Sequence, residues 1–134
     1  MRECLKEEQG FSLLELLVYV AIVGVLMAVA VPKYQQAMAM ANTARIQSDL
    51  RSLDMAVLMY EAQNGRLPTN LQPDLEPYIV DLARLRPPQG KCLLRTGESL
   101  EINAAAYALA KDRSRALCQE HAAGDFGAPD KTAP

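Results

Sequence analysis

An unbroken apolar run from Phe11 to Val31 is the feature that most limits how this 134-residue chain can fold. The run has 21 residues and a single charge, Glu15. As an α-helix it is about 32 Å long at about 1.5 Å per residue, which is enough to cross the hydrocarbon core of a bilayer. An ionisable group in such a segment costs up to ~3 kcal/mol at the centre and less near the ends. Glu15 is therefore a candidate functional residue that needs a partner.

The remainder of the chain has no excess of charge and few large aromatic residues. The 102 residues after Pro32 carry 12 Lys and Arg against 12 Asp and Glu. This balance argues against a general nucleic-acid binder, which needs a surplus of positive charge. With two Phe, five Tyr and no Trp in the chain, we expect a thin core that a disulfide or neighbouring subunits must support.

Of the three cysteines, Cys4 precedes the apolar run, whereas Cys92 and Cys118 follow it. If the later part of the chain lies outside the cytoplasm, Cys92 and Cys118 are the only pair there and we expect a disulfide between them. Such a bond would contribute about 3–4 kcal/mol in the chain-entropy model. The alternative is two unrelated buried thiols.

Two ordinary interpretations of the apolar run leave Glu15 unexplained. A secretory signal peptide could be cut at Ala28-Val29-Ala30, but its first ten residues, MRECLKEEQG, mix acids with bases and the run is long for such a peptide. A plain signal anchor accounts for the length of the run but gives the carboxylate no role.

The stretch GFSLLELLVYVAIVGVLMAVAVPKY, which begins at Gly10, closely resembles the N-terminus of type IV prepilins and type II secretion pseudopilins. The resemblance implies that a prepilin peptidase cuts after Gly10 and methylates the new amine of Phe11. It also implies that Glu15 is the assembly residue, whose carboxylate pairs with the amine of a neighbouring subunit. The leader departs from the family's habit, because Glu7 and Glu8 stand where basic residues are common.

Gly24 and Pro32 also fall where this family usually has a glycine and a proline. Proline lacks an N–H group and clashes with the preceding turn, and glycine weakens a helix. The resemblance implies a helix break over roughly 24–32 in a filament, whereas we expect only a bend in an isolated subunit.

The expected fold is α+β, with a long N-terminal spine helix whose C-terminal half packs against a small antiparallel sheet. The expected organisation is a leader at 1–10, a transmembrane or filament-core half-helix at 11–32 and a globular domain at 33–134. The helix continues through 33–64 and ends at Asn64-Gly65. Its core-facing side is a heptad-like stripe: Ile46, Leu50, Leu53, Val57 and Tyr60. Charged residues, Asp49 and Asp54 among them, lie off this stripe, mostly towards water.

Beyond the helix the elements are short. The prolines of segment 64–82 exclude a long element. This segment resembles the pseudopilin stretch after the spine helix, which implies a turn followed by a short helix. Residues 84–91 are expected to form a loop. Residues 91–95 and 99–103 predict a hairpin with Gly97 in its turn. For 104–120 strands are favoured, with a helix left open, and the tail 122–134 is expected to be loose.

No catalytic constellation is present in the sequence: it contains no nucleophile–base pair, phosphate loop or paired catalytic carboxylates. His121 lies near Cys118, but scattered ligands are weak evidence for a metal site. We therefore expect no enzyme activity, no cofactor and no metal. Four cations within twelve residues could form a basic patch that contacts DNA or an acidic subunit surface, against a solvated basic loop as the simpler interpretation: Arg84, Arg86, Lys91 and Arg95.

The sequence thus predicts a structural subunit of a type IV pilus-like filament. The resemblance implies an inner-membrane precursor with a cytoplasmic N-terminus and a periplasmic or extracellular filament after assembly. The implied partners are further copies and related pilins, a prepilin peptidase, a platform protein and an assembly ATPase. A secretion pseudopilin and a DNA-uptake pilin are close alternatives. The alternative from a different class is a secreted or anchored binding domain with an ordinary signal sequence.

Overall fold

The computed structural model describes residues 10–129. Residues 1–9 of the expected leader and residues 130–134 of the expected loose tail lie outside this range. Contacts divide the chain into two compact units, with the boundary between Gln35 and Gln36.

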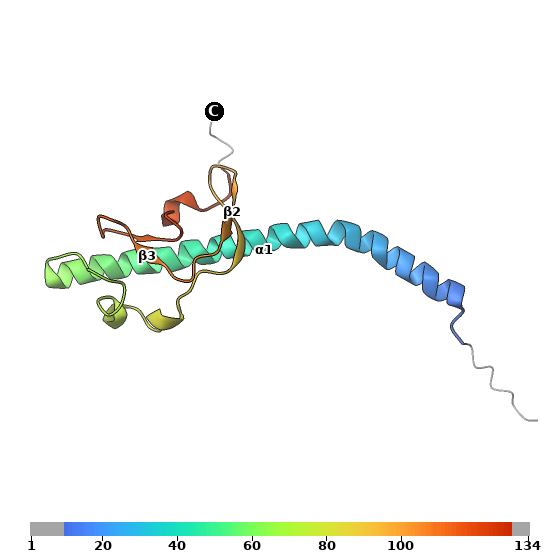
Figure 1. The fold of residues 1–134 in the computed structure, drawn as a ribbon, viewed down its shortest axis with the longest axis horizontal. Helices are drawn as coiled ribbons and strands as arrows, with labels where there is room; N and C mark the ends of the chain where they lie inside the picture. Colours follow the sequence, from blue (N-terminus) through green and yellow to red (C-terminus); the bar gives the residue numbers. More distant parts are fainter. Residues whose placement is uncertain (1–9, 130–134) are drawn as a thin grey trace, which may run out of the picture. The chain divides into compact units, whose positions relative to one another are not determined.

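Helix α1 runs from Leu13 to Asn64 (Figure 1). The helix ends where the sequence predicts, because Gly65 takes a left-handed conformation with φ of 67°. The backbone N–H of Gly65 donates to the carbonyl of Glu61 at 2.8 Å, which closes the last turn.

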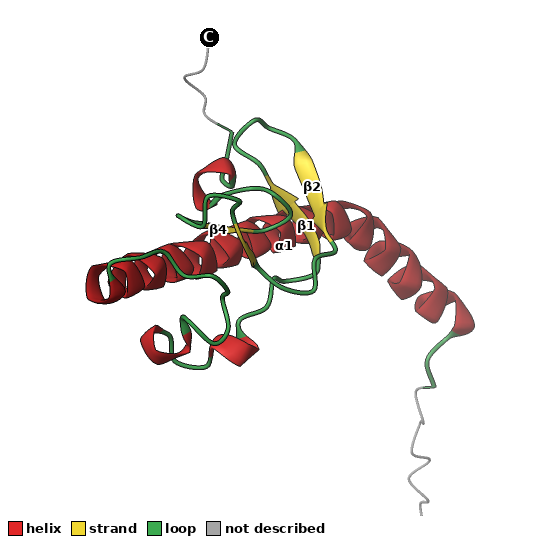
Figure 2. Cartoon of the chain, turned by 60° about the vertical axis from the view of Figure 1, so that its left-hand side comes forward, coloured by secondary structure: helices red, strands yellow, loops and turns green. Residues whose placement is uncertain are grey.

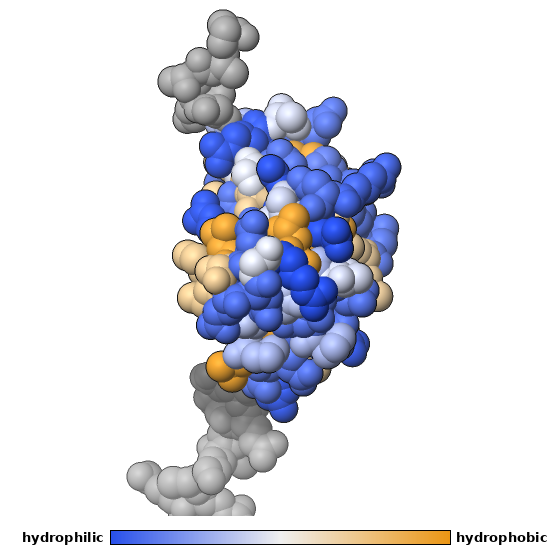
Figure 3. All heavy atoms as spheres, turned by 90° about the vertical axis from the view of Figure 1, so that its left-hand side faces the viewer, coloured by the Kyte–Doolittle hydropathy of each residue, from blue (hydrophilic) through white to orange (hydrophobic). Residues whose placement is uncertain are grey.

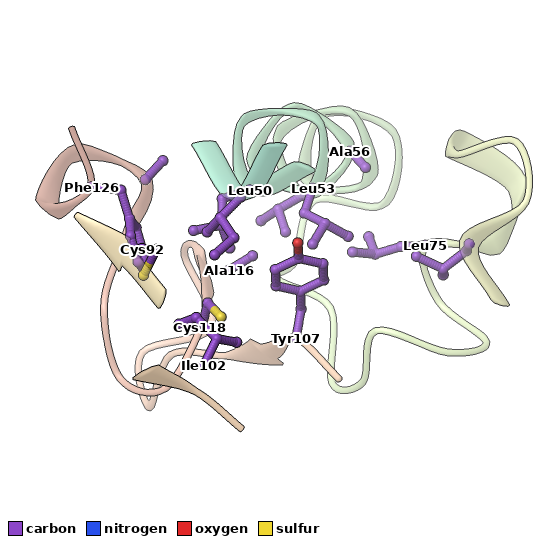
Figure 4. Close-up of a cluster of buried hydrophobic side chains, with 14 of the residues drawn as sticks. Leu50, Leu53, Ala56, Leu75, Cys92, Ile102, Tyr107, Ala116, Cys118 and Phe126 are labelled. Atoms are coloured by element: carbon purple, nitrogen blue, oxygen red, sulfur yellow. The ribbon is translucent and has the colours of Figure 1, made fainter. Parts of the chain in front are cut away.

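The predicted apolar stripe of α1 is confirmed as the centre of the core. All five stripe residues are buried, and other elements add residues such as Leu75, Ile102 and Phe126 to the same cluster. Figure 4 shows Leu50 and Leu53 pointing from α1 towards the side chain of Tyr107. The second half of α1 is thus one wall of the domain, and its heptad spacing is explained by packing inside the chain.

The segment after α1 does not form the short helix that we expected. It contains two single 3-10 turns, η1 at Glu76–Tyr78 and η2 at Leu82–Arg84. The prolines of this segment deprive a longer helix of backbone donors. Burial nevertheless follows the expectation, because Leu75 and Leu82 are both buried.

The strands form two separate two-stranded antiparallel sheets (Figure 2). Strand β1, Gly90–Leu93, pairs with β2, Ser99–Ile102, and Gly97 has a φ of 92° in the loop between them. Strand β3, Ala108–Leu109, pairs with β4, Ala116–Leu117. The predicted hairpin is confirmed, and segment 104–120 contains strands and no helix. The α+β, pilin-like fold class is confirmed as well.

The tail is less loose than we expected as far as it is described. A 3-10 turn, η3, spans Ala123–Asp125, and Phe126 after it is fully buried and forms a bridge to Leu94. The N–H of Gly127 donates to the carbonyl of Leu93 at 3.1 Å. The prediction was wrong for residues 122–129 because burial of one phenylalanine ring outweighs the glycine content of the segment.

Polar side chains of α1 form hydrogen bonds with strands β1 and β4, with Tyr107 and with the tail. The sequence did not predict these contacts. Thr43 Oγ1 accepts a hydrogen bond from the N–H of Leu93 at 2.7 Å, and Gln47 donates to the carbonyl of Phe126. Asp54 Oδ1 accepts from the N–H of Ala116, and Asp49 Oδ2 accepts from the hydroxyl of Tyr107, both at 2.7 Å.

The expectation that the charged residues beside the stripe point to water is therefore wrong for Asp49 and Asp54. The side chain of Asp49 is only 17% exposed. Burial raises the pKa of Tyr107, and its hydrogen bond to Asp49 raises that pKa further. Two sheets of two strands each leave many backbone groups unpaired, and α1 supplies partners for several of them.

We predict that Asp54→Ala lowers the free energy of unfolding by about 1–3 kcal/mol, because the N–H of Ala116 is left without an acceptor at a fully buried residue. Urea denaturation of the full chain in detergent, followed by circular dichroism, measures the change. Glu61→Ala is the matched control, since Glu61 is an exposed acid of the same helix. Equal stability of the two variants would contradict the assigned role of Asp54.

Candidate functional site: the exposed N-terminal half of α1

The first half of α1 is apolar on all sides and uncovered. It is long and apolar enough to cross a membrane by length and composition, and none of its apolar window is buried. Its large apolar side chains are at least 50% exposed: Leu13, Leu14, Leu16, Leu17, Val18, Tyr19, Val20, Ile22, Val23, Val25, Leu26, Met27, Val29 and Val31. Exposed apolar surface of this extent marks a membrane or protein interaction surface.

The predicted cleavage and methylation residues lie at the free end of this surface. Gly10 is exposed, and Phe11 is 74% exposed just before the helix begins. The ring of Phe11 approaches Tyr19 with centroids 6.2 Å apart and planes tilted by 57°. An exposed Gly-Phe bond outside the helix is open to a peptidase.

Glu15 lies in the first turn of α1 and is exposed. Within residues 10–129 its carboxylate forms no ion pair, since the salt bridges there join Arg45 to Asp49 and His121 to Asp125. The positive end of the helix dipole favours a carboxylate at this position. The carboxylate of Glu15 is therefore available to form an ion pair with a cation of another molecule.

One local signal around Glu15 was missed in the sequence. Helix α1 begins at Leu13, so Ser12 is the residue before the helix and Glu15 the third residue in it. Ser-x-x-Glu is the spacing of a capping box, in which the two side chains satisfy free N–H groups at a helix start. The N–H of Leu16 donates to the carbonyl of Ser12 at 3.1 Å, which closes the first turn. The sequence pattern alone could have set the helix start two residues after Phe11.

Gly24 and Pro32 lie inside α1, which continues through both residues. The isolated chain therefore has no helix break at 24–32. The break expected in a filament stays a prediction.

Cys92 and Cys118 are free thiols in this structure, so the predicted disulfide is not formed in it. Both residues are fully buried in one core cluster (Figure 4). Burial raises the pKa of Cys118 to about 11 and also raises the pKa of Cys92. The disulfide stays a prediction for an oxidising compartment.

The four cations of the predicted basic patch are all exposed but lie on different elements. Arg84 ends η2, Lys91 lies in β1 and Arg95 follows that strand. Lys91 pairs with Glu101 in the β1–β2 register, so an acid lies directly beside it. This arrangement weakens the case for a purely positive surface.

The side chain of His121 lies beside a buried aromatic ring and an acidic side chain. Its ring lies edge-on to Phe126 with centroids 5.9 Å apart, and its Nδ1 is 3.9 Å from Asp125 Oδ2. Among the described residues, no group of three or more His, Cys, Asp or Glu side chains is placed to hold a metal ion.

Comparison with known proteins places the site in a recognised class. Residues 5–31 match the family described as the prokaryotic N-terminal methylation motif. This match covers the Gly10-Phe11 bond, Glu15 and the exposed apolar run of α1.

Curated relatives resemble the chain over its N-terminal part. The type II secretion system core protein G of Klebsiella pneumoniae is 37% identical over 68 residues, which is 51% of this chain and 49% of that protein. Fimbrial protein EcpB of Eikenella corrodens is 37% identical over 79 residues, 59% of this chain and 48% of the relative. A fimbrial protein of Pseudomonas aeruginosa is 40% identical over 52 residues, 39% of this chain and 34% of the relative.

The chain thus spans about half the length of the first relatives that it matches, or less. No solved structure matches it. The predicted resemblance to type IV pilins and type II secretion pseudopilins is confirmed, and the chain carries their N-terminal methylation motif.

We predict that iodoacetamide labels Cys92 and Cys118 much more slowly in the native protein than in urea, because burial keeps both thiols protonated and inaccessible. Peptide mass spectrometry on reduced protein measures the labelling at each cysteine. In protein taken from an oxidising compartment, a disulfide would block labelling in urea until a reductant is added. Rapid labelling of the native reduced protein would contradict the buried placement of the thiols.

Proposed function

We propose that this protein is a structural subunit of a type IV pilus-like filament. The observation that carries the proposal is the coincidence of the methylation motif at 5–31 with an apolar half-helix that the described chain leaves uncovered. Such a segment needs lipid around it before assembly and other subunits around it afterwards.

In this proposal a prepilin peptidase cuts the Gly10–Phe11 bond and methylates the new amine. Methylation keeps the positive charge of that amine. Cleavage thereby creates a cation at the membrane edge, where the apolar run contains no cation of its own.

Glu15 supplies the complementary charge. The carboxylate of one subunit pairs with the Phe11 amine of a neighbour as the helix leaves the lipid for the filament core. An ion pair in a low-dielectric setting is favourable only with both partners present, and loss of one partner leaves a buried charge that costs about 3–5 kcal/mol. The pair therefore sets the axial register between adjacent subunits. The helix break at Gly24 and Pro32 belongs to this assembled state.

The precursor is a single-pass protein of the inner membrane with a cytoplasmic N-terminus, and the filament is periplasmic or extracellular. The partners are further copies and related pilins, the peptidase, a platform protein and an assembly ATPase. The protein works as a polymer unit and not as an enzyme. A type II secretion pseudopilus subunit is the second candidate, favoured by the similarity to core protein G.

We predict that protein purified from its native membrane begins with N-methylated Phe11. N-terminal peptide mass spectrometry together with the intact mass measures this. A start near Val31 would instead identify an ordinary exported domain, and the assembly role of Glu15 would be wrong.

We predict that Glu15→Gln leaves the precursor in the membrane and correctly cut, but reduces filament yield by at least about tenfold because the neighbour's amine loses its counter-charge. Sheared filaments quantified by immunoblot against total membrane protein measure the yield. Glu61→Gln is the control, because it removes the same charge from an exposed site of α1 in the other part of the chain. Normal filaments from the Glu15 variant would overturn the charge-pairing account.

A further inference from the structure

The turn that joins β3 to β4 carries three exposed cations, and the function proposed above gives them no role. Lys111, Arg113 and Arg115 occupy alternate positions of the segment KDRSR, and all three are exposed. The four cations of the patch predicted from the sequence lie on different elements, whereas these three share one turn. We call residues 110–115 the β3–β4 turn.

Only one acid interrupts this positive charge. Asp112 lies between Lys111 and Arg113, and Ser114 donates hydrogen bonds to both of its carboxylate oxygens, from the hydroxyl at 2.6 Å and from the backbone N–H at 3.3 Å. Three positive charges and one negative charge leave the turn with a net charge of +2. Within residues 10–129 no salt bridge includes any of the three cations. The turn therefore presents positive charge that no ion pair in the described chain neutralises.

Hydrogen bonds hold the β3–β4 turn in one conformation. The N–H of Ala110 donates to the carbonyl of Arg115 at 2.9 Å, and the N–H of Arg113 donates back to the carbonyl of Ala110 at 2.8 Å. Arg113 has a φ of 59°, a left-handed conformation that a residue with a side chain keeps only where the surrounding structure imposes it. The cations are thus carried by a preorganised backbone, which lowers the entropy lost on binding.

The turn is the tip of a narrow two-stranded ribbon. Strands β3 and β4 form a sheet of their own, and neighbouring strands lie about 4.8 Å apart. Ala110 faces Arg115 across the end of the ribbon, so Lys111 and Arg115 belong to its two opposite sides and Arg113 to the loop between them. In Figure 1 the turn extends from β3 towards the C-terminal end of α1. Figure 3 looks at that end of the molecule and shows a mostly hydrophilic surface with hydrophobic residues scattered over it, which suits a solvated, charged partner.

Duplex DNA has both the shape and the charge that fit such a tip. Its major groove is about 12 Å wide and admits a two-stranded β-ribbon, and a row of phosphates runs along each edge of the groove. A ribbon tip in this groove places the cations of its two sides next to opposite phosphate rows, whereas a flat acidic protein surface meets the tip alone. The arginines add a planar fork of N–H donors that matches the oxygens of a phosphate.

We propose that the β3–β4 turn binds the backbone of duplex DNA irrespective of base sequence, with Lys111, Arg113 and Arg115 each contacting one phosphate. The rest of the chain after Pro32 adds no surplus of positive charge, so the contact is limited to a few phosphates and the binding is weak and salt-dependent. The site lies in the globular part and goes beyond the proposed filament role. Its loss leaves assembly through Glu15 intact.

Fluorescence anisotropy of a fluorescein-labelled DNA duplex of about 20 base pairs, two turns of the double helix, measures the binding. The full chain is held in nanodiscs of phosphatidylcholine, which carries no net charge, and empty nanodiscs are the blank. For three phosphate contacts, the logarithm of the binding constant should fall with the logarithm of the salt concentration with a slope of about −2.7. This slope corresponds to a loss of about 40-fold in affinity between about 50 and 200 mM salt.

Single substitutions assign the slope to the turn. Lys111→Gln, Arg113→Gln and Arg115→Gln should each weaken binding and make the slope shallower by about 0.9, because one phosphate contact fewer releases counterions. Arg51→Gln is the matched control, since it removes an exposed guanidinium from α1 and should change neither the affinity nor the slope. Equal slopes for the wild type and the three turn variants, or no binding at the lowest salt concentration, would overturn the proposal.

A further variant separates loss of charge from loss of folding. Asp112→Asn removes the negative charge of the turn but keeps an acceptor for Ser114, so it should bind the duplex more tightly than the wild type does. Unchanged or weaker binding by this variant would contradict the electrostatic account. Displacement of the duplex by polyglutamate, or by phosphatidylserine vesicles, at a lower charge concentration than by unlabelled duplex would also overturn the proposal, in favour of an acidic protein or a membrane surface.

Discussion

The whole protein depends on one helix whose apolar residues are distributed in two different ways. In the first half of α1 these apolar residues lie on every side of the helix, and the rest of the described chain does not bury them. In the second half they form a single stripe, and Ile46, Leu50 and Leu53 on that stripe are completely buried. A helix that is apolar all round must find a solvent or partners outside its own domain, whereas a striped helix can be satisfied by its own domain. The division of the protein into an uncovered apolar segment and a globular part follows from this change of pattern.

The globular part is held by polar contacts as well as by its thin apolar core. Its sheets have two strands each, and two-stranded sheets are marginally stable by themselves. Helix α1 compensates with side chains that pair with backbone groups of the sheets and tail, among them Thr43, Gln47 and Asp54. Each such hydrogen bond contributes about 0.5–1.5 kcal/mol net, and its loss costs more where the partner is buried. Because Cys92 and Cys118 are free thiols in this structure, these contacts stabilise the domain without a disulfide between them.

The proposed N-terminal site depends on a charge that cleavage creates. The carboxylate that pairs with this charge lies in apolar surroundings, so the strength of the pair depends on the exclusion of water. Such a pair suits a permanent contact between subunits of a polymer.

The sequence alone determined the features that depend on neighbouring residues. The apolar run, the methylation motif around Gly10 and Glu15, the end of α1 at Asn64 and the hairpin closed by Gly97 are all local patterns with fixed spacing. The tertiary structure decided what depends on residues far apart in the chain. The sequence predicts solvated charges at Asp49 and Asp54, but residues about 60 positions later donate hydrogen bonds to both carboxylates. Phe126 orders a tail that its glycines predict to be loose. Periodicity reports which face of an element is buried, but it carries no information about which distant backbone group will need a partner there.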